Sequence, residues 1–195
     1  MLSQLSTLKQ RLAIPAVDVQ FDDLLTAALT AISVRFDREL SRTLVRTASA
    51  TFEFADETEI IPACYPIESV SKFELKTSEA EGWLEQTGVQ FLIRRSCIIS
   101  LQSPICNLHS AICTSRVTYT GGYVLPGDTV GPGQTPLPAD LEQAAIEQTA
   151  AWFLNRDKIG LEVHWPKGGV YEKLSQLPLL PQVQAVLSRY TRWAI

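Results

Sequence analysis

The sequence is poor in the residue types from which active sites are most often built. It has two histidines, His109 and His164, and four cysteines among 195 residues. It contains neither the GxSxG turn of serine hydrolases nor the HExxH helix of zinc proteases. Its carboxylate pairs are explained by capping and solvation, because Asp22–Asp23 stands at a predicted helix start and Asp56–Glu57 in a predicted turn. We therefore predict that the protein is not an enzyme and has no cofactor.

The sequence also lacks a basic surplus and a long apolar run. Its formal net charge is −4, whereas a protein that grips nucleic acid needs clustered lysine and arginine to neutralise phosphates. No hydrophobic stretch approaches the roughly 20 residues that cross a membrane, and the first residues do not resemble a signal peptide. Without an export signal, the cysteines are expected to be reduced thiols. Hydrophobic residues make up 46% of the chain, which predicts a folded core in one domain with appendages.

Hydrophobic residues at helical spacing predict two helices near the N-terminus. Four leucines from Leu2 to Leu12 predict a short helix over residues 2–13. Apolar residues three or four apart from Leu25 to Leu40 predict a long helix over residues 22–42. The charged side of the long helix is an ordinary solvated face or, in an assembly, a channel-facing or inter-subunit surface. The arginines of this side are Arg35, Arg38 and Arg42, with Glu39 beside them.

Between about residues 47 and 120 the pattern changes to an alternation of apolar and polar residues, which is typical of strands. The link from Tyr65 to Val70 is expected to be an extended loop or a sheet edge, because its proline cannot donate to a sheet ladder. Short turns separate the strands, so a small antiparallel sheet region flanked by helices is expected. The predicted strands cover residues 47–55, 71–75, 89–93, 97–101 and 112–120.

A strand, a glycine- and proline-rich loop and a long helix follow one another in residues 116–156. The loop over residues 121–138 holds half of the chain's 10 glycines, including Gly127 and Gly131. It lacks the GxxxxGK[ST] pattern of a phosphate-binding loop. A loop of this length without its own structure is either a flexible connector or functional, here by touching a neighbouring subunit. The helix over residues 138–157 is rich in alanine, which suits close packing of helices.

Beyond residue 160 the composition loosens, so we predict a single body over residues 1–160 and a C-terminal docking arm over residues 161–195. The last segment has an apolar helical face with arginines beside it. So short a helix is not stable alone in water, and it must dock on its own domain or on another chain. The residues assigned to this docking arm are Val183, Val186, Leu187, Arg189, Tyr190, Arg192 and Trp193.

One group of residues has the spacing of a metal site. Cys106, His109 and Cys113, with Cys97 as a fourth ligand, have the spacing of a Cys3His zinc site. They lie in apolar, strand-like sequence, where free cysteine behaves as a small buried hydrophobe. Buried thiols are therefore the preferred interpretation, and a small zinc-stabilised binding module is the alternative.

Five segments of the sequence follow one another in a characteristic order. They are DDLLTAALTAISVRFDREL, YPIESVSKFEL, VTYTGGY, LPADLEQAAIEQTAAWFLNR and LPLLPQVQAVLSRYTRW. In this order they resemble the head–tail connector proteins of long-tailed bacteriophages, also called adaptor or head-completion proteins. The resemblance covers about residues 21–193, and the pairing of VTYTGGY with the LPADLEQAA helix contributes most to it.

The resemblance implies a structural protein of the virion neck, assembled in the host cytoplasm. Such adaptors form a homo-oligomeric ring, a dodecamer with one subunit per portal subunit. They attach below the portal protein, extend the DNA channel and provide the docking surface for the next neck protein. Double-stranded DNA passes through without sequence-specific binding, which a mildly acidic protein suits.

The fold that we expect is α+β. It combines a helical bundle, with long helices near residues 22–42 and 138–157, a small antiparallel sheet region over about residues 47–120 and a C-terminal helical arm. Extra sequence around residues 79–110 and after residue 160 distinguishes this chain from the smaller adaptors. A different protein of the virion neck, a stopper or a tail-completion protein, is therefore the alternative assignment.

Overall fold

The computed structural model of the chain describes residues 1–55, 57–102, 114–158, 162–163, 172–173 and 178–192. The chain divides into two compact units. The helical unit comprises Met1–Glu39 and Leu137–Tyr190, and the β unit comprises Leu40–Pro136 and the residues from Thr191. The β unit is thus inserted into the sequence of the helical unit. The predicted boundary between body and arm, at residues 160–161, falls outside the described residues.

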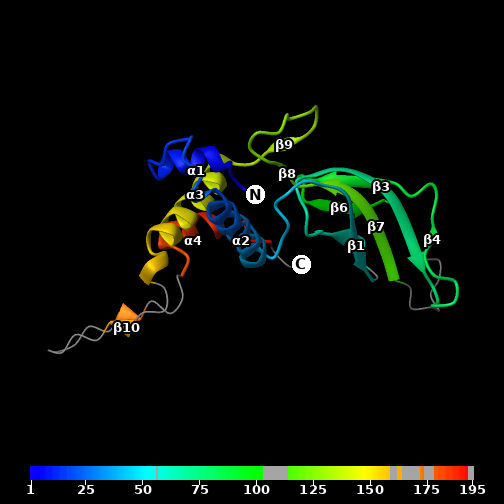
Figure 1. The fold of residues 1–195 in the computed structure, drawn as a ribbon. Helices are drawn as coiled ribbons and strands as arrows, with labels where there is room; N and C mark the ends of the chain where they lie inside the picture. The colour runs from blue at the N-terminus through cyan, green and yellow to red at the C-terminus, as the bar shows by residue number, and fades with distance from the viewer. Residues whose placement is uncertain (56, 103–113, 159–161, 164–171, 174–177, 193–195) are drawn as a thin grey trace. The chain divides into compact units, whose positions relative to one another are not determined.

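The helical unit is built around the alanine-rich helix α3. Helices α1 and α4 both pack against α3, and an apolar cluster with members from α1, α2 and α3 fills the unit. The helices are α1 (Leu5–Arg11), α2 (Asp22–Leu40), α3 (Ala139–Leu154) and α4 (Pro181–Leu187), with a 3-10 turn at Arg156–Lys158 and the strand pair β10 (Glu162–Val163) and β11 (Glu172–Lys173) (Figure 1). The cluster contains Leu8, Leu25, Ile146, Ala150 and Phe153.

The two long helices form where the sequence predicts them, but they end earlier. Helix α2 stops at Leu40 because Ser41 has a positive φ of 52°, a left-handed conformation that ends a helix. Helix α3 stops at Leu154, and the Asn155 side chain donates to the carbonyl oxygen of Ala151 at 2.8 Å. Helices α1 and α4 have seven residues each, so the structure does not show a bundle of long helices.

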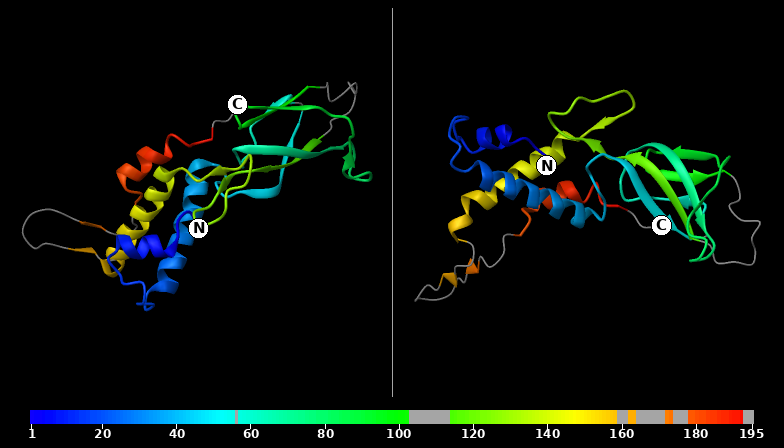
Figure 2. Two further views of the ribbon diagram at one scale, coloured as in Figure 1. Left: turned by 90° about the horizontal axis from the view of Figure 1, so that it is seen from above. Right: turned by 45° about the vertical axis from the view of Figure 1, so that its right-hand side comes forward.

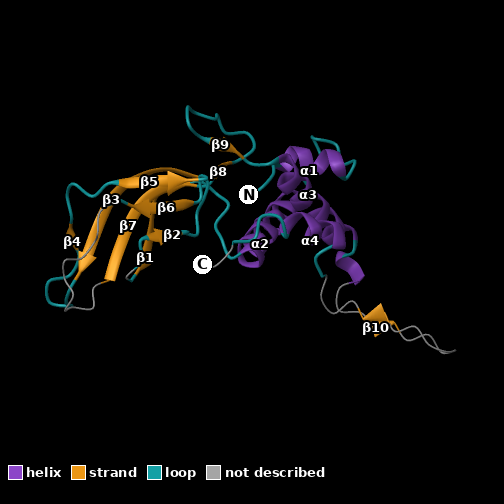
Figure 3. Ribbon diagram, turned by 180° about the vertical axis from the view of Figure 1, so that it is seen from behind, coloured by secondary structure: helices purple, strands orange, loops and turns teal. Residues whose placement is uncertain are grey.

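The β unit contains a four-stranded and a three-stranded antiparallel sheet. The larger has the order β1-β7-β3-β4 and the smaller the order β2-β6-β5. Figures 2 and 3 show their strands lying together, and one apolar cluster joins residues of both sheets, such as Phe54, Val117 and Ile99. The strands are β1 (Thr47–Phe54), β2 (Glu59–Ile60), β3 (Ile67–Lys76), β4 (Leu84–Glu85), β5 (Phe91–Arg94), β6 (Ile98–Leu101) and β7 (Thr114–Gly121).

The strand content confirms the α+β class. The segment after Pro66 was expected to be an extended loop or a sheet edge. Strand β3 begins at Ile67 and pairs with β7 along its length, but it pairs with β4 only at Glu74 and Leu75, so its first half is a strand at a sheet edge. Pro66 lies just before the strand, so its missing N–H breaks no ladder bond. Alternation also identified β7, whose residues are buried and half-buried in turn from Thr114 to Gly121.

The glycine-rich loop after β7 has structure of its own, contrary to expectation. Strands β8 (Tyr123–Val124) and β9 (Thr135–Pro136) pair in parallel and bring its two ends together. Val45 forms a further parallel bridge with Tyr123. The intervening residues, 125–134, therefore project from a fixed base, and we call them the projecting loop.

Candidate assembly surfaces

The described residues present several surfaces that can meet another protein. Among these residues, no group of three histidine, cysteine or acidic side chains is placed to hold a metal ion. Cys64 and Cys97 are free thiols, whereas Cys106, His109 and Cys113 lie outside the described residues. None of the described helices combines the length and the hydropathy of a membrane span.

The charged side of α2 carries Arg35 and Arg38 but not Arg42. Arg38 is exposed, and Arg35 lies 3.7 Å from Glu39 in an i,i+4 ion pair. Arg42 comes after the helix end and is only 4% exposed. The structure therefore corrects the prediction that Arg42 belongs to an inter-subunit or channel-facing surface.

Arg42 instead holds together segments of the β unit. Its guanidinium carbon lies 3.3 Å from the centroid of the Tyr65 ring and 5.4 Å from that of Tyr123, and it donates to the Tyr65 carbonyl oxygen. Stacking on aromatic faces partly offsets the loss of hydration of the buried charge. Burial raises the pKa of Tyr65, and the nearby Arg42 guanidinium opposes that rise. Arg42 is thus a core residue.

The VTYTGGY segment, residues 117–123, forms the centre of the β unit. The Gly122 N–H donates to the Pro66 carbonyl oxygen at 2.8 Å, and the Tyr123 N–H donates to the Leu44 carbonyl oxygen at 2.8 Å. A Cβ on Gly121 would lie 2.6 Å from the Cys64 carbonyl oxygen, so a side chain does not fit there. The two glycines are therefore required for close approach of three backbone segments, which is a structural role and not ligand binding.

The projecting loop presents one of the predicted inter-subunit surfaces. Gly127 has a φ of 96° and is exposed, and the Gly131 N–H donates to the side-chain oxygen of Gln134 at 2.8 Å. Val130, at the tip, is 45% exposed. A cavity of about 270 Å³ lies at the base of the loop. It is lined by Val45, Arg46, Tyr123, Val124, Leu125, Asp128, Thr129 and Gln134.

The docking arm packs against its own chain. Val183 and Leu187 are 1% and 4% exposed, in a unit where α4 packs on α3. The Tyr190 hydroxyl donates to Asp140 at 2.8 Å. The sequence left open whether this helix docks on its own domain or on another chain. The structure shows that the chain's own helical unit covers the apolar face of α4. Contact of the arm with another chain stays a prediction for its outer side, where Arg189 is exposed and Val186 half-buried.

Two further residues complete the arm. In the β unit, Arg192 donates its backbone N–H to Leu40 at 2.9 Å and its side chain to the Ile61 carbonyl oxygen. Trp193, predicted as a docking anchor, lies outside the described residues.

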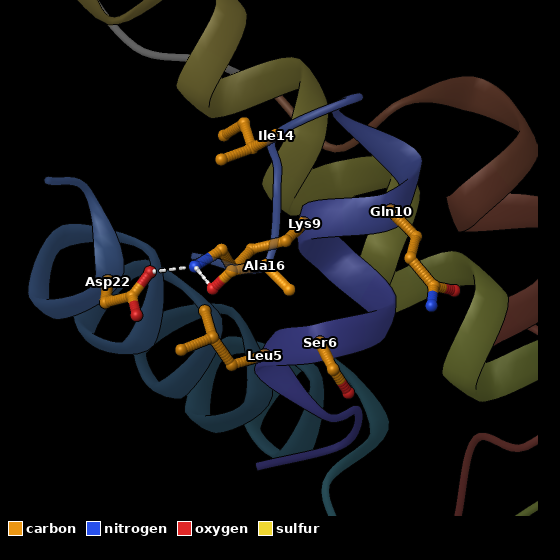
Figure 4. A pocket seen from close by; sticks show the side chains of 7 residues that line it. All are labelled: Leu5, Ser6, Lys9, Gln10, Ile14, Ala16 and Asp22. Carbon is orange, nitrogen blue, oxygen red and sulfur yellow. Dashed lines mark hydrogen bonds and ion pairs between the residues drawn. The ribbon is translucent and has the colours of Figure 1, made fainter. Parts of the chain in front are cut away.

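A buried lysine braces the link between α1 and α2. Lys9 is 4% exposed, and its ammonium group donates to the carbonyl oxygens of Ala16 and Asp18 and to the Asp22 carboxylate at 3.1, 2.6 and 2.8 Å. Figure 4 shows the side chain reaching from α1 towards Asp22. The adjoining cavity, about 220 Å³, is also lined by Leu5, Ser6, Gln10 and Ile14. All three donors of the ammonium are used, so Lys9 stabilises the link and offers no donor to a ligand.

A row of charged residues crosses the larger sheet, and sequence analysis did not identify it. Glu53, Arg116, Glu74 and Glu85 are paired in register on β1, β7, β3 and β4. Arg116 donates to Glu53 at 2.8 Å and stacks on Trp83, its guanidinium carbon 3.7 Å from the ring centroid. The polar phase of each strand was visible in the sequence, but the register that unites these residues was not.

Three solved structures with a similar fold are chains of gene transfer agent (GTA) particles. A chain in the neck of an empty gene transfer agent (GTA) particle, computed with C6 symmetry, has a TM-score of 0.60 and 16% identity, with 100% of this chain and 91% of that chain covered. A chain in the virion of a native GTA particle has a TM-score of 0.51 at the same identity and coverage. A chain in the neck of a native GTA particle, computed with C12 symmetry, has a TM-score of 0.50 and 16% identity, with 98% and 89% covered.

These likenesses show that the fold of the whole chain occurs in chains of GTA necks and virions. No protein-family model matches the sequence, and a comparison with curated proteins finds no match.

Proposed function

We propose that the protein is a structural component of a virion neck, a ring-forming head–tail adaptor. The observation that carries this proposal is the likeness in fold along nearly the full length of chains from GTA necks, in particles computed with C6 and C12 symmetry. It agrees with the phage connector family that the order of sequence features resembles. A dodecameric ring attaches below the portal protein and extends the DNA channel. Its other side receives a stopper or tail-completion protein.

The arm and the projecting loop are the proposed contact surfaces. A cyclic ring needs two different surfaces on each subunit, which meet head to tail. The outer side of the docking arm has Val186 on α4 and Arg189 just after α4. This side and the projecting loop, with Gly127 and Gly131, both lie outside the apolar clusters of their units. We assign contact with the portal or a neighbouring subunit to the arm, and contact with a neighbour or the channel to the loop.

The charge of the protein supports passage of DNA rather than its retention. With a net charge of −4, the ring lacks the surplus of lysine and arginine that holds phosphates. Arg35 and Arg38 are proposed to face the channel or an inter-subunit seam. Arg35 is already paired with Glu39 on its own helix. Double-stranded DNA then slides through without sequence-specific binding, and no catalytic step is involved.

The proposal is tested by electron microscopy of the purified protein, alone and mixed with the portal protein of the same particle. The expected result is a closed ring stacked on the portal, with twelvefold symmetry. The same ring in complex with a stopper or tail protein, but never with the portal, would identify the chain as a different neck protein and overturn the adaptor role. A chain that forms no ring under any of these conditions would overturn the ring itself.

A further inference from the structure

Helix α2 has a second apolar face, opposite the one that enters the core. Leu24 and Val34 are 38% and 46% exposed, and Ala27 and Ala31 between them are exposed as well. These four residues and Arg38 follow one another at spacings of three and four, so they form one stripe along four turns of the helix. We call this stripe the outer face of α2. An exposed apolar face on a helix can be buried against a second surface.

The charges at the ends of the outer face indicate what that surface is. Asp23 is exposed at the N-terminal end of the face, and Arg38 is exposed at its C-terminal end. The residues of the face between these two charges, Leu24, Ala27, Ala31 and Val34, are uncharged, and Arg35 lies beside the face. Two copies of this face in the same direction would place Asp23 against Asp23 and Arg38 against Arg38. Two copies in opposite directions place each Asp23 beside the Arg38 of the second copy, which is favourable.

The sizes of the side chains also favour antiparallel pairing of the two α2 helices. With Ala31 at the centre, the methyl groups of two alanines meet and allow the helices to approach closely. Val34 of one copy then faces Ala27 of the other, a large residue against a small one. Leu24 lies beside the aliphatic part of Arg38 of the second copy, which can cover it while the guanidinium stays in water. Antiparallel helices also place their dipoles in the favourable relative direction.

We propose that two copies of this chain pair through the outer face of α2, antiparallel, about a twofold axis at Ala31. A single pair of helix faces is smaller than a standard protein interface, so the dimer is weak and reversible. This inference does not rest on the proposed neck function. A twofold pair cannot be a pair of neighbours in a cyclic ring, where all copies point the same way. The dimer therefore belongs to the free protein, where it covers an apolar face that is otherwise exposed to water.

Sedimentation velocity of the full chain, over a range of concentrations, tests the proposal. The wild type is expected to show a monomer–dimer equilibrium. Asp23→Arg and Arg38→Asp each place like charges together twice per dimer, and each is expected to weaken dimerisation at least tenfold. An equimolar mixture of these two variants restores both ion pairs, so its affinity is expected to return to near the wild-type value. Gln10→Arg, an exposed change on α1, is the matched control and leaves the equilibrium unchanged.

Ala31→Glu provides an independent test at an exposed position. It places two carboxylates at the twofold axis and is expected to abolish the dimer without changing the circular dichroism of the monomer. A wild type that stays monomeric at every concentration overturns the proposal. So does a dimer that Ala31→Glu leaves intact, or one that the mixture of charge variants fails to restore. Failure of ring formation in the microscope, with the dimer present, would count against the neck function alone.

Discussion

The phenolic oxygen of Tyr119 accepts a hydrogen bond from the backbone N–H of Cys64 at 3.1 Å, inside the core of the β unit. Tyr119 is 1% exposed, and burial raises its pKa to about 12. The bond joins the middle of β7 to a segment that lies between β2 and β3. It gives a hydrogen-bond acceptor to the buried Cys64 N–H, which pairs in neither sheet. Both the ring and the hydroxyl of Tyr119 therefore contribute to stability.

The pKa of Tyr119 predicts a specific loss of stability in alkali. Between pH 10 and 12 the unfolded chain releases the proton while the folded protein keeps it, so the free energy of unfolding falls as pH rises. The contribution of this group is about 1.4 kcal/mol per pH unit in that window. Tyr119→Phe is expected to unfold about 1–2 kcal/mol more easily at pH 8, because the Cys64 N–H loses its acceptor.

Urea unfolding of the two proteins at pH 8, 10 and 11 checks this. The difference in stability between wild type and Tyr119→Phe should shrink as pH rises above 10, since only the wild type has the titrating group. A difference that stays constant across this range would show that Tyr119 is not the group responsible for the loss of stability in alkali.

Lys9→Met should destabilise the helical unit although it removes a charge from the interior. The methionine fills a similar space, but the carbonyl oxygens of Ala16 and Asp18 and the Asp22 carboxylate lose their donor. We expect a loss of about 2–4 kcal/mol in the free energy of unfolding. Lys76→Met is the control, because Lys76 pairs with the exposed Glu79. That change should stay within about 0.5 kcal/mol in the same denaturation experiment.

Gly122→Ala should be much more harmful than Gly82→Ala, although both glycines have a positive φ. At Gly122 the new Cβ would lie 2.7 Å from the Val45 carbonyl oxygen and 2.8 Å from the Arg46 backbone, whereas at Gly82 it meets nothing within 4 Å. Gly82→Ala therefore costs only backbone strain, about 1 kcal/mol, and Gly122→Ala adds a backbone clash for a total of about 3 kcal/mol or more. Melting temperatures of the two variants, measured side by side, decide the matter, and equal values would contradict the close approach.

The sequence predicted most elements of this fold because their periodicity is strong and local. The inner face of α2 and the alternation in β7 were both visible as spacing, and burial follows them. The ends of the helices were less accurate, since Ser41 ends α2 through a left-handed conformation that a serine rarely adopts. The start of β3 was placed at residue 71 and not at Ile67, because the prolines left the preceding segment as either an extended loop or a sheet edge.

The arrangement of residues that are distant in sequence could not be predicted in the same way. Arg42 was assigned to a helix face by spacing, but the helix ends two residues before it, and its guanidinium lies against Tyr65. The row from Glu53 through Arg116 depends on the register of strands far apart in the chain. The burial of Val183 and Leu187 could be expected from their spacing, but what buries them depends on where α4 lies on α3.

The arm offers a test that separates docking from folding. Arg189→Glu reverses an exposed charge and should weaken binding to the portal or to a neighbouring subunit at least tenfold, with stability changed by less than about 0.5 kcal/mol. Leu187→Ala, at a buried position, should instead lower stability by about 2–5 kcal/mol. Gln182→Glu, an exposed change on α4, is the matched control for binding.

Co-sedimentation with the portal ring and thermal unfolding of each variant give the two readouts. Arg189→Glu that binds as tightly as the wild type would remove Arg189 from the proposed contact. Deletion of everything after Pro181 is a poorer experiment, because it also removes the buried residues Val183 and Leu187 from the helical unit.

The insertion of the β unit has a consequence for synthesis on the ribosome. Leu8 and Leu25 meet Ile146 and Phe153 in one core, yet the whole of Leu40–Pro136 is translated between them. Helices α1 and α2 therefore emerge with apolar surface exposed and must wait for α3. The described strands of the β unit are all synthesised before α3, so this unit can fold first. Nascent-chain length should thus set the order in which the two units gain protection from proteases, with the N-terminal helices among the last elements to become protected.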